Sequence, residues 1–203
     1  MGELNFHMGV MKSGKSLGLL NTAEQLERGN HPILVMKPAT DNRDGELITS
    51  RFGQLSRMPD IVFGEDERLD DMIRRQRVAD AIPHYVRILI DEAQFATEEQ
   101  VDQLLELAVE DDEKIDAYGL RVDFLNHLFE GSKRLIEVAH NVHEYLAVCR
   151  CGDDARTNAR LIDGQFVFEG DSVAIEIGET TYEPLCIDCY LSEKRLAQIT
   201  TNS

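Results

Sequence analysis

The sequence predicts an α/β protein in which helices cover a mostly parallel β-sheet, followed by a smaller β-rich region. Short apolar strands alternate with amphipathic helices up to about residue 148, and a glycine-rich motif separates the first strand from the first helix. All four cysteines lie in the last third of the chain, where the apolar runs become short. We therefore expect one domain over residues 1–148, a second over residues 149–190, and a C-terminal tail over residues 191–203.

Each expected element follows from a local pattern. Apolar, β-prone runs predict strands at residues 4–8, 32–36, 86–90, 115–119 and 144–148. Helical patterns cover residues 15–28, 69–82, 97–109 and 132–140. Gly29 and Asn30 are typical of a helix end, and Thr97 with Gln100 forms a capping-box pattern. The polar residues 37–53 predict a loop. Residues 161–185 predict small antiparallel strands, and a short helix is expected from residue 191.

Composition and charge limit the function. The chain has 203 residues, 42% of them hydrophobic, and a formal net charge of −17. An acidic surface repels nucleic acids and anionic membranes, and no basic patch compensates for it. No apolar run approaches the roughly 18 residues of a membrane span, and no secretory signal is visible. The sequence thus predicts a cytoplasmic protein without nucleic-acid or membrane partners.

Residues 9–16, GVMKSGKS, match the Walker A pattern G-x-x-x-x-G-K-[ST] at every fixed position. The glycines let successive backbone N–H groups point at phosphate oxygens, and the following helix directs its positive end to the same place. Lys15 is expected to reach the terminal phosphates of ATP, and Ser16 to bind Mg²⁺. The alternative, a structural glycine turn, leaves the flanking strand and helix unexplained.

Residues 88–95, ILIDEAQF, have the Walker B form of an apolar strand that ends in acids. Asp91 is placed to hold Mg²⁺, directly or through water. Glu92 is the second acid, and it could activate a water, as in an ATPase, or a substrate hydroxyl, as in a kinase. The ATP-binding residues expected from the two motifs are Gly9, Met11, Lys12, Ser13, Gly14, Lys15, Ser16, Asp91 and Gln94.

The cysteines form two close pairs, Cys149 with Cys151 and Cys186 with Cys189. In a reducing compartment this arrangement indicates metal binding before disulfides. Four thiolates form a closed tetrahedral site with no position for water, so its role would be structural. The alternative is four buried free thiols.

Five segments occur in the order and spacing found in thymidine kinases of the type II family, which the chain resembles from residue 4 to residue 190. They are GVMKSGKS, DEAQF, YGLRVDF at 118–124, LFEGSKRL at 128–135 and YEPLCIDCY at 182–190. The resemblance implies a RecA-like P-loop domain with a zinc-bearing lasso domain over the nucleoside. It also implies phosphate transfer from ATP to the 5′-hydroxyl of thymidine, with deoxyuridine as a further acceptor, for salvage of nucleotides for DNA synthesis. Feedback by thymidine triphosphate and a homotetramer are implied as well.

The resemblance also implies roles for individual residues. Glu92 would take the proton from the 5′-hydroxyl, and the cysteines would hold a structural zinc, although the first pair is C-x-C where many relatives have C-x-x-C. The implied substrate-binding residues line the base, flank the active site or lie in the lasso: Met11, Asp41, Arg43, Phe95, Leu120, Phe124, Thr157, Ile175 and Tyr182.

Three other functions remain open at this point. One is a kinase for a different small hydroxyl substrate. Another is a RecA-like ATPase module that moves or binds nucleic acid, against which the acidic charge argues. The third is a zinc-stabilised binding protein with a degenerate P-loop, against which the intact Lys15, Ser16, Asp91 and Glu92 argue.

Overall fold

A six-stranded sheet organises the first part of the chain in the computed structural model, which describes residues 1–40, 47–50, 55–170 and 179–201. The strand order is β5-β2-β6-β7-β1-β8, and all neighbouring strands are parallel. This confirms the predicted fold class. The strands are β1 (Glu3–Gly9), β2 (Ile33–Pro38), β5 (Ile61–Phe63), β6 (Arg87–Ile90), β7 (Lys114–Leu120) and β8 (Asn141–Tyr145).

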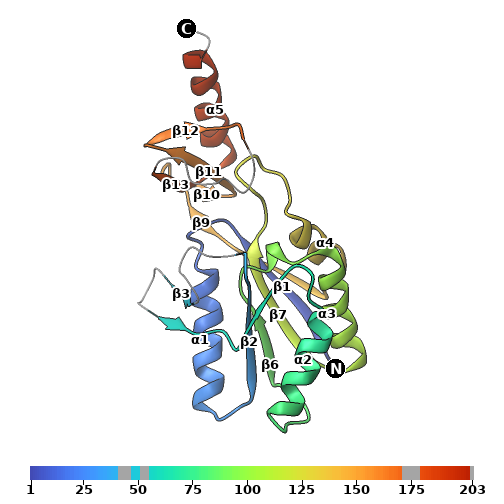
Figure 1. The fold of residues 1–203 in the computed structure, drawn as a ribbon. Coiled ribbons are helices and arrows are strands. Elements are labelled where there is room, and N and C mark those ends of the chain that lie inside the picture. The colour runs from blue at the N-terminus through green and yellow to red at the C-terminus, as the bar shows by residue number, and fades with distance from the viewer. Residues whose placement is uncertain (41–46, 51–54, 171–178, 202–203) are drawn as a thin grey trace.

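Helices cover both faces of this sheet (Figure 1). They are α1 (Lys15–Arg28), α2 (Leu69–Ala79), the 3-10 turn η1 (Ala93–Phe95), α3 (Glu98–Glu110) and α4 (Glu130–Val138). Side chains alternate along each strand, so Leu34 and Met36 of β2 belong to the core cluster that includes residues of α2, α3 and α4, whereas Val35 belongs to the cluster that includes residues of α1. Burial on both faces explains why these strands read as continuous apolar runs in the sequence.

Beyond the carboxyl ends of the strands lies a smaller β-rich part (Figure 1). It contains β9 (Ala147–Val148), β10 (Asp154–Ala155), β11 (Thr157–Ile162), β12 (Gln165–Val167) and β13 (Thr180–Leu185). β11 pairs antiparallel with β12 and β13, as the short apolar runs predict. Helix α5 (Ile187–Thr201) follows. A short ribbon of β3 (Ile48–Thr49) and β4 (Ser56–Arg57) forms a separate two-stranded sheet.

Several element boundaries differ from the sequence prediction. The strand expected at 144–148 is split, because β8 ends at Tyr145 and β9 pairs with β10 instead. The last helix begins at Ile187, four residues before its expected start, so it includes Cys189. Strand β5 was not predicted, since three residues are too few to show a period.

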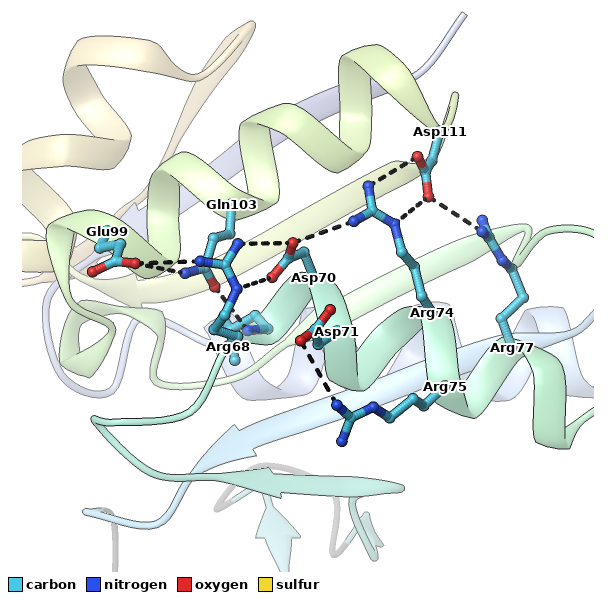
Figure 2. Close-up of polar contacts among 10 residues, drawn as sticks. Arg68, Asp70, Asp71, Arg74, Arg75, Arg77, Glu99, Gln103 and Asp111 are labelled. Atoms are coloured by element: carbon cyan, nitrogen blue, oxygen red, sulfur yellow. Dashed lines mark hydrogen bonds and ion pairs between the residues drawn. The ribbon is translucent and has the colours of Figure 1, made fainter.

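An ion-pair network joins α2 to both ends of α3 (Figure 2). The Arg74 guanidinium donates to Asp111 at 3.0 and 3.1 Å and to Asp70 at 3.2 Å. Arg68 also contacts Asp70, and Arg77 contacts both Asp111 and the buried Glu113. These contacts hold the pKa of Asp111 below its usual value, mainly through its hydrogen bond with Arg74.

In the described part of the chain, no helix has the length and apolarity needed to cross a membrane.

Candidate active site

The Walker A residues form the turn between β1 and α1, at the carboxyl edge of the sheet. Gly14 has φ 88°, a left-handed conformation that favours glycine, and it directly precedes the first turn of α1. At Gly9 a Cβ would lie 2.6 Å from the Ser13 hydroxyl oxygen and from the Tyr145 carbonyl oxygen. The Lys15 ammonium is folded back on the loop and donates to the Val10 carbonyl at 2.8 Å.

Asp91 directly follows β6 and is 6% exposed. The Ser16 hydroxyl, at the start of α1, donates to an Asp91 carboxylate oxygen at 3.4 Å. A hydroxyl and a carboxylate oxygen in this proximity are the hard ligands that Mg²⁺ prefers. The two residues predicted to bind Mg²⁺ are therefore adjacent, although 75 positions separate them in the sequence.

Glu92 lies at the start of η1 with φ 50° and ψ 36°, a conformation that few non-glycine residues adopt. The buried Gln94 amide contacts it, with Nε2 donating to Glu92 Oε2. The other end of the same amide accepts from the Leu120 N–H at 2.9 Å. Gly119 makes this packing possible, because a Cβ there would lie 2.8 Å from Gln94 Oε1. Gln94 thus joins the candidate base to the end of β7.

Four of the residues expected to contact the nucleoside lie on η1, at the end of β7, in the segment that follows β7 and on β13. Leu120 is the last residue of β7, and the Phe124 side chain is buried beneath the Arg160 guanidinium, 3.7 Å from its ring centroid. Phe95 is partly exposed and meets Phe129 edge-on at 5.7 Å. Tyr182 of β13 is partly exposed and pairs with Arg160 across the strands.

Two further predicted substrate-binding residues make hydrogen bonds within the protein, and three lie outside the described residues. The Thr157 hydroxyl donates to the Leu185 carbonyl at 3.0 Å within the small sheet, and Thr157 is 1% exposed. Met11 donates its N–H to the Asn158 side chain. Asp41, Arg43 and Ile175 lie outside the described residues. The substrate-binding roles predicted for all of these residues stay predictions.

The four cysteines converge, as their pairing predicts. Their sulfur atoms all lie within 4.8 Å of one another, and the Sγ atoms of Cys151 and Cys186 are 3.6 Å apart. Zinc–sulfur bonds of about 2.3 Å in a tetrahedron place sulfurs about 3.8 Å apart, so this donor set fits zinc. Burial raises the pKa of Cys149, but the N–H groups of Cys151 and Cys186 outweigh it and hold that pKa at about 7.

Three residues that the structure brings to this region do not stand out in the sequence. Asn158 contacts the phosphate loop, Arg160 covers Phe124, and the Ser132 hydroxyl donates to the Leu120 carbonyl at 2.5 Å. The alternation of β11 is the signal that could have found the first two, because it sets Asn158 and Arg160 on one face and Thr157 on the other.

A phosphate loop after the first strand and an acidic pair on a nearby strand define a P-loop nucleotide-binding protein. The family model described as "Thymidine kinase" matches residues 2–190, and the chain belongs to this family.

Curated thymidine kinases align with this chain over most of their length. The thymidine kinase of Lactiplantibacillus plantarum is 34% identical over 98% of this chain and 100% of its own. That of Enterobacteria phage T4 is 37% identical over 92% of this chain and 94% of its own. A Streptococcus pyogenes thymidine kinase is 34% identical over 95% and 98%, respectively. The Pif1 helicase structure from Candida albicans matches 71% of this chain and 36% of its own length, with 17% identity and a TM-score of 0.42.

Proposed function

We propose that the chain is an ATP-dependent thymidine kinase that transfers the γ-phosphate of ATP to the 5′-hydroxyl of thymidine. Family membership supports the substrate. The observation that carries the chemistry is the position of Glu92. It directly follows Asp91, whose carboxylate meets Ser16, and its own carboxylate is held by Gln94. A base fixed beside the phosphate loop is what transfer to a hydroxyl requires.

In this proposal the residues of the chain position groups and neutralise charge. Lys15 turns from the Val10 carbonyl towards the terminal phosphates, where it stabilises negative charge. Ser16 and Asp91 hold Mg²⁺, which supplies further charge neutralisation when bound. Glu92 accepts the proton of the 5′-hydroxyl. The remaining Walker A residues and Gln94 belong to the proposed ATP site, and Gln94 acts there through its bond to Glu92.

The nucleoside side of the proposed site is built from the end of β7 and the β-rich part. Phe95, Leu120, Phe124 and Tyr182 are its proposed lining, together with Met11, Thr157 and the predicted residues outside the described ranges. Zinc on the four cysteines would fix both ends of the segment 149–190, which we propose as the second domain. The family resemblance further supports a cytoplasmic homotetramer in nucleotide salvage with feedback by thymidine triphosphate.

A phosphate-transfer assay tests the proposal. Purified chain is incubated with Mg²⁺, radiolabelled ATP and a panel of thymidine, deoxyuridine, deoxycytidine and purine deoxynucleosides. We expect labelled thymidylate as the main product, with slower labelling of deoxyuridine. Release of labelled inorganic phosphate at the same rate with and without nucleosides would instead indicate an ATPase. Preferential labelling of another acceptor would indicate a different kinase.

A further inference from the structure

One side chain of the β-rich part bridges the phosphate loop and the segment after β7. The Asn158 amide oxygen accepts from the Met11 N–H at 2.7 Å, and its NH₂ group donates to the Val122 carbonyl at 3.1 Å. Asn158 is 2% exposed, so both bonds are shielded from water. If the Asn158 amide were rotated by half a turn, its NH₂ group would face the Met11 N–H and its oxygen would face the Val122 carbonyl. Both pairings are unfavourable, so the two contacts together fix the orientation of the amide.

The same stretch of the phosphate loop also packs against the cysteine region. Val10 is 3% exposed and belongs to the apolar cluster that contains Cys149 and Cys186. Val10 also carries the carbonyl that accepts from Lys15. The first turn of the phosphate loop therefore rests on the metal-binding segment through packing at Val10 and through a buried hydrogen bond at Met11.

Alternate side chains of β11 point to opposite faces, so the residues of the bridge and the residues that bond within the small sheet lie on different faces. Asn158 and Arg160 face the segment after β7, where Arg160 covers the Phe124 ring. Their neighbour Thr157 instead bonds to Leu185 of β13. Displacing β11 would therefore disturb Met11, Val122 and Phe124 together.

We propose that Asn158 is a positioning residue that couples the phosphate loop to the metal-stapled β-rich segment, so that a bound nucleotide orders β11 and the nucleoside side of the site. A nucleotide that fixes the loop backbone at Met11 also fixes the acceptor of its N–H, and through Asn158 the strand that carries it. By linkage, fixing β11 favours the phosphate-binding conformation of the loop. The inference deepens the proposed function, but its first consequence involves the nucleotide alone.

Hydrogen–deuterium exchange with a non-hydrolysable ATP analogue and Mg²⁺ tests this coupling without any nucleoside. In the wild type, saturating analogue should slow exchange in the phosphate loop and, by about fivefold or more, in residues 157–162. In Asn158→Ala, slowing should persist in the loop and disappear from residues 157–162. Unchanged protection of residues 157–162 in this variant, or none in the wild type, would overturn the proposal. Failure of thymidine phosphorylation alone would refute the proposed function and leave this result standing.

Two further variants separate coupling from general loss of packing. Tyr190→Phe removes another buried hydrogen bond of the β-rich part, from the Tyr190 hydroxyl to the Phe124 carbonyl at 2.8 Å, and leaves Met11 untouched. It should keep the wild-type protection. Asn158→Leu fills nearly the same volume and removes both polar contacts without adding charge, so it should lose protection of residues 157–162 as alanine does, and it serves if the alanine variant does not fold. Loss of protection in Tyr190→Phe, or wild-type protection in Asn158→Leu, would refute the role of the Asn158 bridge.

Discussion

Replacing Glu92 by glutamine tests whether this carboxylate accepts a proton or only supports the fold. Both residues carry the same Cβ, so the left-handed backbone at φ 50° should cost the same in each. The glutamine oxygen can still accept the bond that Gln94 donates. The variant therefore loses a basic oxygen and keeps the contact with Gln94.

The size of the effect follows from this difference. Loss of a general base costs about 10²- to 10⁴-fold in rate. This corresponds to ~2.7–5.4 kcal/mol of transition-state stabilisation, at ~1.36 kcal/mol for each factor of ten. The loss should fall on the phosphoryl-transfer step, because nothing that binds thymidine is removed.

Gln94→Leu is the comparison, since it keeps the carboxylate and removes the donor that holds it, together with the acceptor of the Leu120 N–H. A hydrogen bond to a charged group contributes about 1.5–3 kcal/mol, so this rate should fall by about 10- to 150-fold. Single-turnover transfer from radiolabelled ATP gives both rates, and calorimetry gives thymidine affinity. A Glu92→Gln rate within about threefold of wild type would refute the general-base assignment. A collapse of affinity at an unchanged rate would make Glu92 a binding residue.

The remaining predictions concern phosphate binding, the metal and the ion network. Lys15→Ala should lower turnover by about 10²- to 10³-fold, because the variant no longer stabilises the charge on the phosphates. Its circular dichroism spectrum should match that of the wild type, and normal turnover would refute the ATP site. Cys186→Ser should lose zinc by elemental analysis and weaken both thymidine and ATP binding by calorimetry, whereas a metal-free variant with normal affinities would refute the staple. Arg74→Gln should destabilise the fold by about 1 kcal/mol in urea unfolding at pH 7, a modest figure because Arg74 is partly exposed. Because the Asp111 pKa is lowered in the folded state, this contribution is complete above about pH 5 and disappears as pH falls through the folded pKa. Arg75→Gln is the control, because Arg75 is 82% exposed and its contact with Asp71 is 3.7 Å long. An equal loss of unfolding free energy in both variants would refute a stabilising role for the Arg74 ion pairs.

The phosphate site could be predicted from sequence because its geometry is local or follows from sheet topology. Residues 9–16 carry their own turn, and parallel strands bring their carboxyl ends to one edge. The proximity of Ser16 and Asp91 therefore follows from two motifs and one architectural rule. The cysteines converge for a similar reason, since two pairs at the ends of a β-rich segment can meet when its strands pair antiparallel.

The contacts that link these parts could not be predicted, because they depend on side-chain direction in short strands. A shift of one residue reverses the face of β11, and the sequence alone does not fix which of Thr157 and Asn158 faces the phosphate loop. From sequence alone, the phosphate loop lies far from residues 149–190, which predicts that metal loss weakens thymidine binding more than ATP binding. The contacts of Val10 and Met11 revise that expectation.

The backbone of residues 120–124 explains why changes in the segment between the two cysteine pairs, residues 149–190 (the metal segment), should affect the proposed phosphoryl transfer. The Leu120 N–H bonds to Gln94, which holds Glu92, and the Leu120 carbonyl accepts from Ser132. Two residues further on, the Val122 carbonyl accepts from the bridging asparagine, and the Phe124 carbonyl accepts from Tyr190 of the metal segment. Glu92, through Gln94, and the metal segment thus contact opposite ends of this five-residue strip. Loosening the metal end should shift the strip, so the phosphoryl-transfer rate should fall together with nucleoside affinity even though no cysteine lies among the proposed catalytic residues.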